Sequence, residues 1–358
     1  MTRLNKKKTG IAAAIALMLA LIVWLEWPGG TEPTKGAAPL VERVEAGVEK
    51  FLDSSSQAGA KLALDEVRRN LRQMDVAEAR EWLIQEILSG EDLPTHLNLA
   101  LGTDHNLVGW PSYRVFLLDM LFLVDPQYSA DAARTLLSVP ERTMDELAVV
   151  MRNLARAGGT PEDMKALTQA TTEMLQRKDW LKNPSTGFLE GFDLIVHTQN
   201  TAVTPELLRM SEDPAVPKLR QAAFLTLDRL VMARPVEVIP QLDKYATTHP
   251  NSQLMISNMV ARADVRDVEQ RQVVEAYLLN PNRTSEELRG FGATFPNASM
   301  TVSNNLVTKQ KALPVEELMK LDRAALDAVT GWIADARFER AHPALRDAYQ
   351  RLSSFVKP

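Results

Sequence analysis

Three polar residues near the middle of the chain have a spacing that could bind a metal ion. Glu190, Asp193 and His197 stand at i, i+3 and i+7, so a helix places them on one face. Carboxylates and imidazoles are ordinary zinc ligands. The opposite face of that helix would carry three apolar residues, Phe188, Phe192 and Ile195. An amphipathic surface helix shows this same division, so we favour a solvated polar face and predict no metal site.

Two histidines and two aspartates form a second conceivable cluster. His96 and His105 lie beside Asp92 and Asp104, and a hairpin would bring the two imidazoles near each other. A metal site needs a third ligand, and no H-E-x-x-H pattern is present to supply a zinc-binding helix. We therefore interpret both histidines as surface turn residues.

The sequence contains no motif that names a reaction. It has no cysteine, which excludes disulfides, thiolate metal sites and cysteine catalysis. Nucleophile-elbow, Walker and dinucleotide-binding patterns are absent, and no Glu-Ser dipeptide of the lytic transglycosylase kind occurs. We predict no cofactor and disfavour catalysis. An envelope enzyme that acts on cell-wall material through an unrecognised acid and histidine site remains the alternative.

The charge balance argues against nucleic-acid binding. The formal net charge is −5, and residues 1–10 carry four positive charges and no negative one. The remainder of the chain is therefore more acidic than the total suggests. An acidic domain repels phosphate backbones, so we predict no nucleic-acid partner.

Helical patterns dominate from about Leu40 onward. Apolar residues recur at helical spacing, and we predict about a dozen helices of roughly 10–16 residues in an all-α fold. Capping boxes begin helices at Asp75, Thr143 and Thr284, and a capping side chain precedes proline at Thr160, Thr204 and Asp213. The predicted core includes Leu64, Val67, Leu71, Trp82, Leu118, Leu121, Leu147, Leu154, Phe224, Leu227, Leu230 and Leu278.

Residues 90–112 interrupt the helical pattern. Leucines alternate with other residues over 97–101, turn residues occupy 102–106, and 107–110 could return as a second strand. We predict a small β-hairpin whose leucines and tryptophan pack onto neighbouring helices. The hairpin either caps a helical layer, which we favour, or binds a partner. For binding, the candidate interaction residues are Trp110, which offers a large amphipathic surface, His105, Asp104 and His96.

Residues 212–246 have the most characteristic pattern in the chain. Asp213 and Pro214 stand in an inter-helix turn, and Leu219 and Arg220 open the next helix. Inward-facing positions follow at Ala222, Ala223, Leu227 and Leu230. This stretch resembles a HEAT repeat, which implies an α-solenoid of antiparallel helices. An irregular helical bundle is the alternative.

The N-terminus has the features of a membrane anchor. A basic flank of Arg3 and three lysines precedes an apolar run over 11–25, about 22 Å of helix against a hydrocarbon core of about 30 Å. No suitable small-residue pair follows closely, so we favour an uncleaved anchor over a cleaved signal peptide. We assign 1–27 to the basic flank and transmembrane anchor and 28–39 to a flexible linker. An extracytoplasmic domain follows over 40–358, with a possible sub-boundary near 158–161.

The orientation of the anchor decides the expected location and function. A basic flank stays on the cytoplasmic side, so the domain is carried across the membrane, into the periplasm in a Gram-negative bacterium. We therefore predict a membrane-tethered scaffold that binds one or more partner proteins, which the sequence does not identify.

Overall fold

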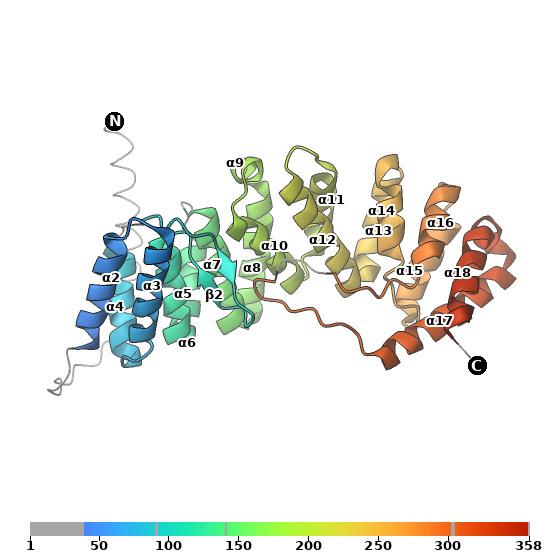
Figure 1. Ribbon diagram of the computed structural model, residues 1–358. Helices are drawn as coiled ribbons and strands as arrows, with labels where there is room; N and C mark the ends of the chain where they lie inside the picture. The colour runs from blue at the N-terminus through green and yellow to red at the C-terminus, as the bar shows by residue number, and fades with distance from the viewer. Residues whose placement is uncertain (1–38, 90–91, 140–141, 302–304, 357–358) are drawn as a thin grey trace. The chain divides into compact units, whose positions relative to one another are not determined.

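The computed structural model describes residues 39–89, 92–139, 142–301 and 305–356 (Figure 1). These residues form 17 α-helices and one small antiparallel two-stranded sheet, so the predicted all-α class with a single hairpin is confirmed. Within this described part, no helix is long and apolar enough to cross a membrane. The predicted anchor and the linker up to residue 38 lie outside the described residues.

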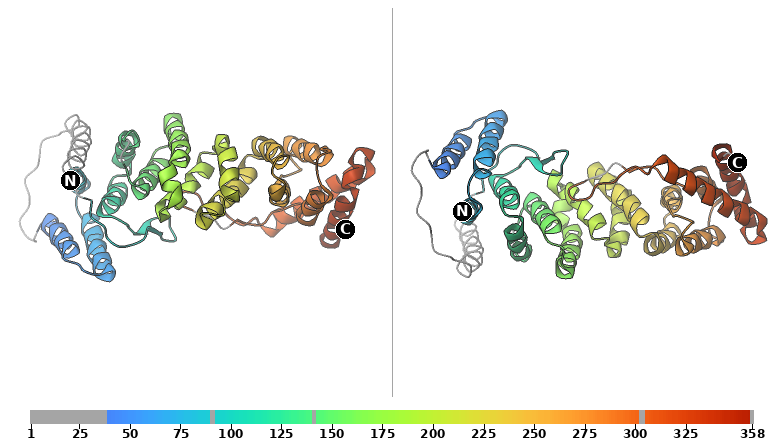
Figure 2. Two further views of the ribbon diagram at one scale, coloured as in Figure 1. Left: turned by 90° about the horizontal axis from the view of Figure 1, so that it is seen from above. Right: turned by 90° about the horizontal axis from the view of Figure 1, so that it is seen from below.

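The chain divides into two compact units. Unit 1 takes the described residues up to Leu194 together with Asn305–Val307, and unit 2 takes the other described residues from Ile195 onward. The predicted sub-boundary near 158–161 lies inside unit 1 and stays a prediction. Figure 2 shows the helices of each unit from two further sides.

In unit 1, each helix packs mainly on its neighbours in the chain. Helix α2 packs on α3, α4 on α5, α5 on α6 and α7, and α7 on α8. The elements are α2 (Leu40–Leu52), α3 (Gln57–Leu71), α4 (Val76–Ser89), β1 (Ala100–Leu101), β2 (Leu107–Gly109), α5 (Tyr113–Val124), α6 (Pro126–Leu137), α7 (Met144–Ala157), α8 (Pro161–Gln176), α9 (Lys178–Lys182) and α10 (Thr186–His197), whose residues from Ile195 onward belong to unit 2.

Unit 2 repeats this sequential packing. Helix α11 packs on α12, α13 on α14 and α15, α14 on α16, and α16 and α17 on α18. The helices are α11 (Thr204–Glu212), α12 (Pro217–Ala233), α13 (Pro235–Ala246), α14 (Gln253–Val260), α15 (Val268–Leu279), α16 (Ser285–Thr294), α17 (Val315–Ala334) and α18 (His342–Phe355). Three short 3-10 turns also occur, η1 (Thr201–Val203), η2 (Pro250–Ser252) and η3 (Ala336–Ala341).

Capping chemistry fixes several helix starts where the sequence predicted them. Thr143 and Thr284 make complete capping boxes, and Thr160 makes one with Pro161 in the first helical turn. Two predicted starts are wrong. Thr204 is the first residue of α11 and its hydroxyl donates to the Thr201 carbonyl, while Asp213 ends α11 four residues before α12 begins at Pro217.

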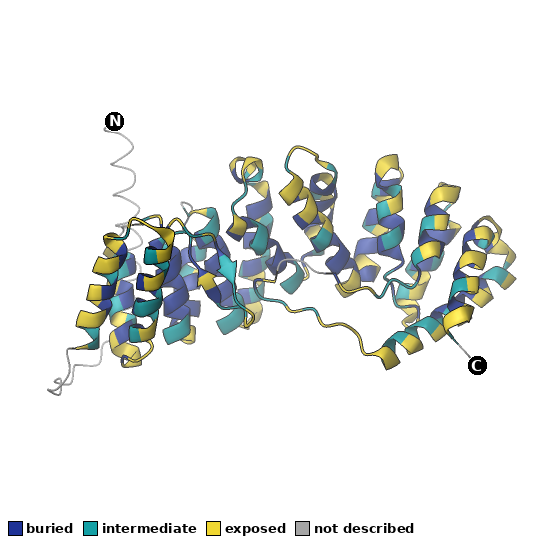
Figure 3. Cartoon of the chain, in the orientation of Figure 1, coloured by how far each residue is buried: buried dark blue, intermediate teal, exposed yellow. Residues whose placement is uncertain are grey.

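The buried faces of the helices agree with the predicted core at all but two positions (Figure 3). Trp82 is only half-buried, and Phe224 is 38% exposed. Phe224 follows Ala223 directly, and successive helical residues point about 100° apart. Because Ala223, Leu227 and Leu230 are completely buried, their stripe turns Phe224 away from the core.

The predicted hairpin is present and short. Ala100 pairs with Gly109 and Leu101 with Leu107, with an irregularity between the two pairs. The Thr95 hydroxyl donates to the Trp110 carbonyl at the base of the hairpin. Leu99 and Leu107 are buried, as expected of hairpin leucines that pack against helices, whereas Leu97 and Leu101 are half-buried.

Candidate functional site

The polar stripe of α10 is not the solvated face that we predicted. Asp193 is only 1% exposed, and Glu190 is half-buried. The apolar face is as expected, because Phe188, Phe192 and Ile195 are buried. Helix α10 therefore carries carboxylates into a packed environment, where they need hydrogen-bond donors.

A short segment from much later in the chain supplies those donors. The backbone N–H of Asn305 donates to Glu190 Oε2 at 3.2 Å, and that of Val307 donates to Asp193 Oδ2 at 2.6 Å. Between them Leu306 is completely buried and begins a bend in the chain. We call Asn305, Leu306 and Val307 the docked bend.

Desolvation affects the carboxylate that binds the first amide. Burial raises the pKa of Glu190, the hydrogen bond from the Asn305 amide opposes this shift, and the nearby Asp193 adds to it. A charge-assisted hydrogen bond from a backbone amide is stronger than a neutral one. The docked bend therefore stabilises the two acids that it covers.

His105 holds the docked bend from the other side. Its Nδ1 lies 2.5 Å from the carbonyl oxygen of Asn305, and because a carbonyl only accepts, Nδ1 must carry the proton in this contact. The residue has a positive φ of 62° at the hairpin tip. Its own carbonyl accepts from Arg152 Nη2 at 3.0 Å and from Arg156 Nη1 at 3.1 Å. The imidazole is thus anchored through its backbone.

Beneath the hairpin tip lies a buried charge pair that the sequence analysis missed. Arg152 Nη1 and Asp119 Oδ1 are 2.8 Å apart, and both side chains are completely buried. Trp110 Nε1 donates to the other Asp119 oxygen at 2.9 Å. Burial raises the pKa of Asp119, and Arg152 and Trp110 offset part of that shift. The sequence did contain one indication of this pair, because Asp119 is a charged residue within the otherwise apolar stretch of α5.

Trp110 does not offer the exposed surface that we expected. It is completely buried and packs edge-on against Phe116, with ring centroids 5.0 Å apart. The expectation that it packs onto neighbouring helices is confirmed. Since a covered indole touches no partner in this conformation, its role is to support the hairpin tip rather than to form an accessible surface.

The other two candidate interaction residues lie at the surface. Asp104 is exposed and accepts hydrogen bonds from the backbone and side chain of Asn106, which lower its pKa. His96 is exposed with φ at 60°, and its carbonyl accepts from Gln57 Nε2 at 2.5 Å. Among the described residues, no group of three His, Asp or Glu side chains is placed to hold a metal ion.

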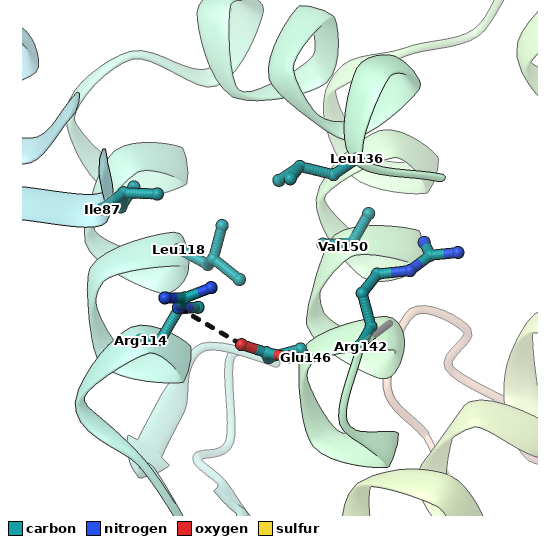
Figure 4. Close-up of a pocket in the computed structure, with 7 residues that line it drawn as sticks. All are labelled: Ile87, Arg114, Leu118, Leu136, Arg142, Glu146 and Val150. Atoms are coloured by element: carbon teal, nitrogen blue, oxygen red, sulfur yellow. Dashed lines mark ion pairs between the residues drawn. The ribbon is translucent and has the colours of Figure 1, made fainter. Parts of the chain in front are cut away.

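A small cavity between α4, α5, α6 and α7 is another polar feature of unit 1 (Figure 4). Its volume is about 20 Å³, room for about one water. Arg114 Nε lies 3.4 Å from Glu146 Oε1, and Arg142 Nη2 donates to the Leu137 carbonyl at 2.8 Å. We do not assign a catalytic site to it.

Comparison with known proteins gives no relative from which a function could be transferred. No family model, no curated protein and no solved structure matches this chain.

Proposed function

We propose that this protein is a membrane-tethered, extracytoplasmic helical-repeat scaffold that binds partner proteins. The docked bend is the observation that carries the proposal. Within unit 1, α10 and the hairpin tip already bind three residues from a distant part of the chain through two amides and one carbonyl, and the leucine among these three residues is buried. Backbone hydrogen bonds and a buried side chain are also contacts by which one protein binds a segment of another.

The packing of the helices supports the scaffold part of the proposal. Within each unit, helices pack mainly on the next one or two along the chain. Repeat proteins have this nearest-neighbour pattern, and they use the extended surface of the stack for binding. The close helix contact expected of a HEAT-like unit also fits, because Ala222 and Ala223 are buried in α12. The HEAT assignment itself remains part of the proposal.

The sequence supports the membrane part of the proposal. The lysine cluster followed by the apolar run 11–25 predicts a single-pass anchor with the N-terminus in the cytoplasm. We expect the full-length protein to stay in the membrane fraction after carbonate extraction. A mature soluble form that begins near residue 31 or 39 would contradict the anchor and leave only the export.

The binding function is tested by cross-linking in the native host. A C-terminal affinity tag on the full-length chain, brief cross-linking and mass spectrometry should recover one or a few extracytoplasmic proteins. The control is a chain with the same anchor and an unrelated helical domain. Recovery of the same proteins by both chains would contradict the scaffold.

An alanine series separates binding from catalysis. Replacement of His96 or His197 should leave the cellular role intact, because a scaffold does not depend on one titratable group. If a carboxylate or histidine other than Glu190, Asp193 and His105, which contact the docked bend, is indispensable while the thermal melt of the variant is unchanged, the envelope-enzyme alternative is favoured instead.

A further inference from the structure

The docked bend has the properties of a bound ligand. Its polar contacts with His105, Glu190 and Asp193 use backbone groups, namely the Asn305 and Val307 amides and the Asn305 carbonyl. Its buried side chain is that of Leu306, whereas Asn305 is exposed and Val307 half-buried. Recognition thus depends on the shape of a bend and on one leucine, and another chain could supply both.

We propose that Glu190, Asp193 and His105 form a binding site for a leucine-bearing bend of a partner protein, and that the docked bend occupies this site in the free chain. The inference rests on the proposed scaffold function and gives that function a location and a ligand class. The partner segment carries a leucine between two residues whose amides are free to donate.

The charge of the site limits which peptide segments can bind there. Two carboxylates one helical turn apart repel an acidic ligand and favour a neutral or basic one. The segment that now occupies the site fits this requirement, because residues 299–313 contain two lysines and no acidic residue. A partner bend should therefore also lack Asp and Glu around its leucine.

Competition between the two ligands decides what a binding experiment will show. A segment tethered to its own site has an effective concentration in the millimolar range, so a free peptide competes poorly with it. Replacing Leu306 with aspartate should weaken the docked bend in two ways, by losing the apolar contact and by adding a negative charge. The emptied site should then accept a peptide.

The experiment uses the full-length chain in detergent micelles. The probe is a fluorescein-labelled peptide with the sequence of residues 301–311, and fluorescence anisotropy reports its binding to the wild type and to Leu306→Asp. We expect binding at least tenfold tighter to the variant. Equal affinity for both chains, or no binding to a variant with a wild-type circular dichroism spectrum, would overturn the proposal.

Two matched peptides test the contacts themselves. N-methylation at the Val307 position removes one N–H donor and keeps every side chain, and it should weaken binding about tenfold or more. A peptide with aspartate in place of leucine should not bind. An N-methylated peptide that binds as well as its parent would show that the amide contact with Asp193 carries no recognition.

A measurement on the wild type tests the proposal even if the Leu306→Asp variant does not fold. Unlabelled peptide at several millimolar should displace the docked bend and speed hydrogen exchange at residues 305–307, while the N-methylated peptide should not. Unchanged exchange would contradict the inference. If partners are cross-linked but the peptide does not change their recovery, the scaffold function is supported and the proposed binding site is contradicted. If the peptide binds but no partner is recovered, the binding site is supported and the scaffold function is contradicted.

Discussion

Substitutions in the buried pair of Asp119 and Arg152, which lies under the hairpin, should lower the free energy of unfolding strongly. Asp119→Leu removes the acceptor of two hydrogen bonds, from Arg152 Nη1 at 2.8 Å and from Trp110 Nε1 at 2.9 Å. It leaves a guanidinium charge buried without its counter-ion, which typically costs about 3–5 kcal/mol. Arg152 keeps its bonds to the carbonyl of His105, so we expect the lower end of that range, about 3 kcal/mol.

A double-mutant cycle isolates the pair. Arg152→Met should cost about as much as Asp119→Leu, because the carboxylate is then buried with only the indole as donor. The double variant buries no charge, so it should be more stable than either single variant. The coupling energy should be at least about 2 kcal/mol in favour of the pair.

The assay is urea denaturation followed by circular dichroism, with hydrogen exchange to assign the loss to unit 1. Exchange should increase at the hairpin and in α5 and α7, because these elements carry the pair and its partners. A cost below 1 kcal/mol for Asp119→Leu, or single-variant costs that simply add in the double variant, would refute the reasoning.

Three further predictions test other parts of the fold. Ala223→Leu should overpack the buried face of α12 and cost about 1–3 kcal/mol in urea denaturation, whereas tolerance of leucine would show that the HEAT resemblance is accidental. Gly292→Ala would place a Cβ against the carbonyl oxygen of Ala344 and should lower the thermal melting temperature, while Gly331→Ala, whose Cβ would have its nearest neighbour at 4.0 Å, should not. The hydrogen bond from Arg134 lowers the pKa of Asp163 below its ordinary 3.8, so Asp163→Asn should destabilise the protein above pH 3.8. The difference in unfolding free energy between variant and wild type should shrink as the pH falls further, because the wild-type carboxylate then becomes protonated. A pH-independent difference would exclude the ion pair as the cause.

Local chemistry explains why much of the helical framework could be predicted. A capping box is complete within four residues, so Thr143, Thr160 and Thr284 specify their helix starts without reference to the rest of the fold. The hairpin was predictable for the same reason, because alternation and turn residues lie side by side in the sequence. The exact start failed at Thr204, which is the first residue of α11, and at Asp213, where the chain makes a longer turn before α12.

The candidate site could not be predicted because its parts lie far apart in the chain. Asp193 and Val307 are 114 residues apart, and nothing near α10 indicates that a later amide will cover its carboxylate. A polar stripe opposite an apolar one looks the same whether water or protein covers it. Trp110 was ambiguous in a similar way, since an indole at the end of a strand can support a core or face a partner.

The site is synthesised before the docked bend that covers it. The residues of unit 1 up to Leu194 leave the ribosome before Asn305–Val307 exist, and the 110 residues between Leu194 and Asn305 take roughly 5–20 seconds to translate. During that interval Glu190 and Asp193 have no docked bend to cover them. A chaperone or partner that meets the nascent chain in this window would find the site vacant, with no tethered competitor to displace.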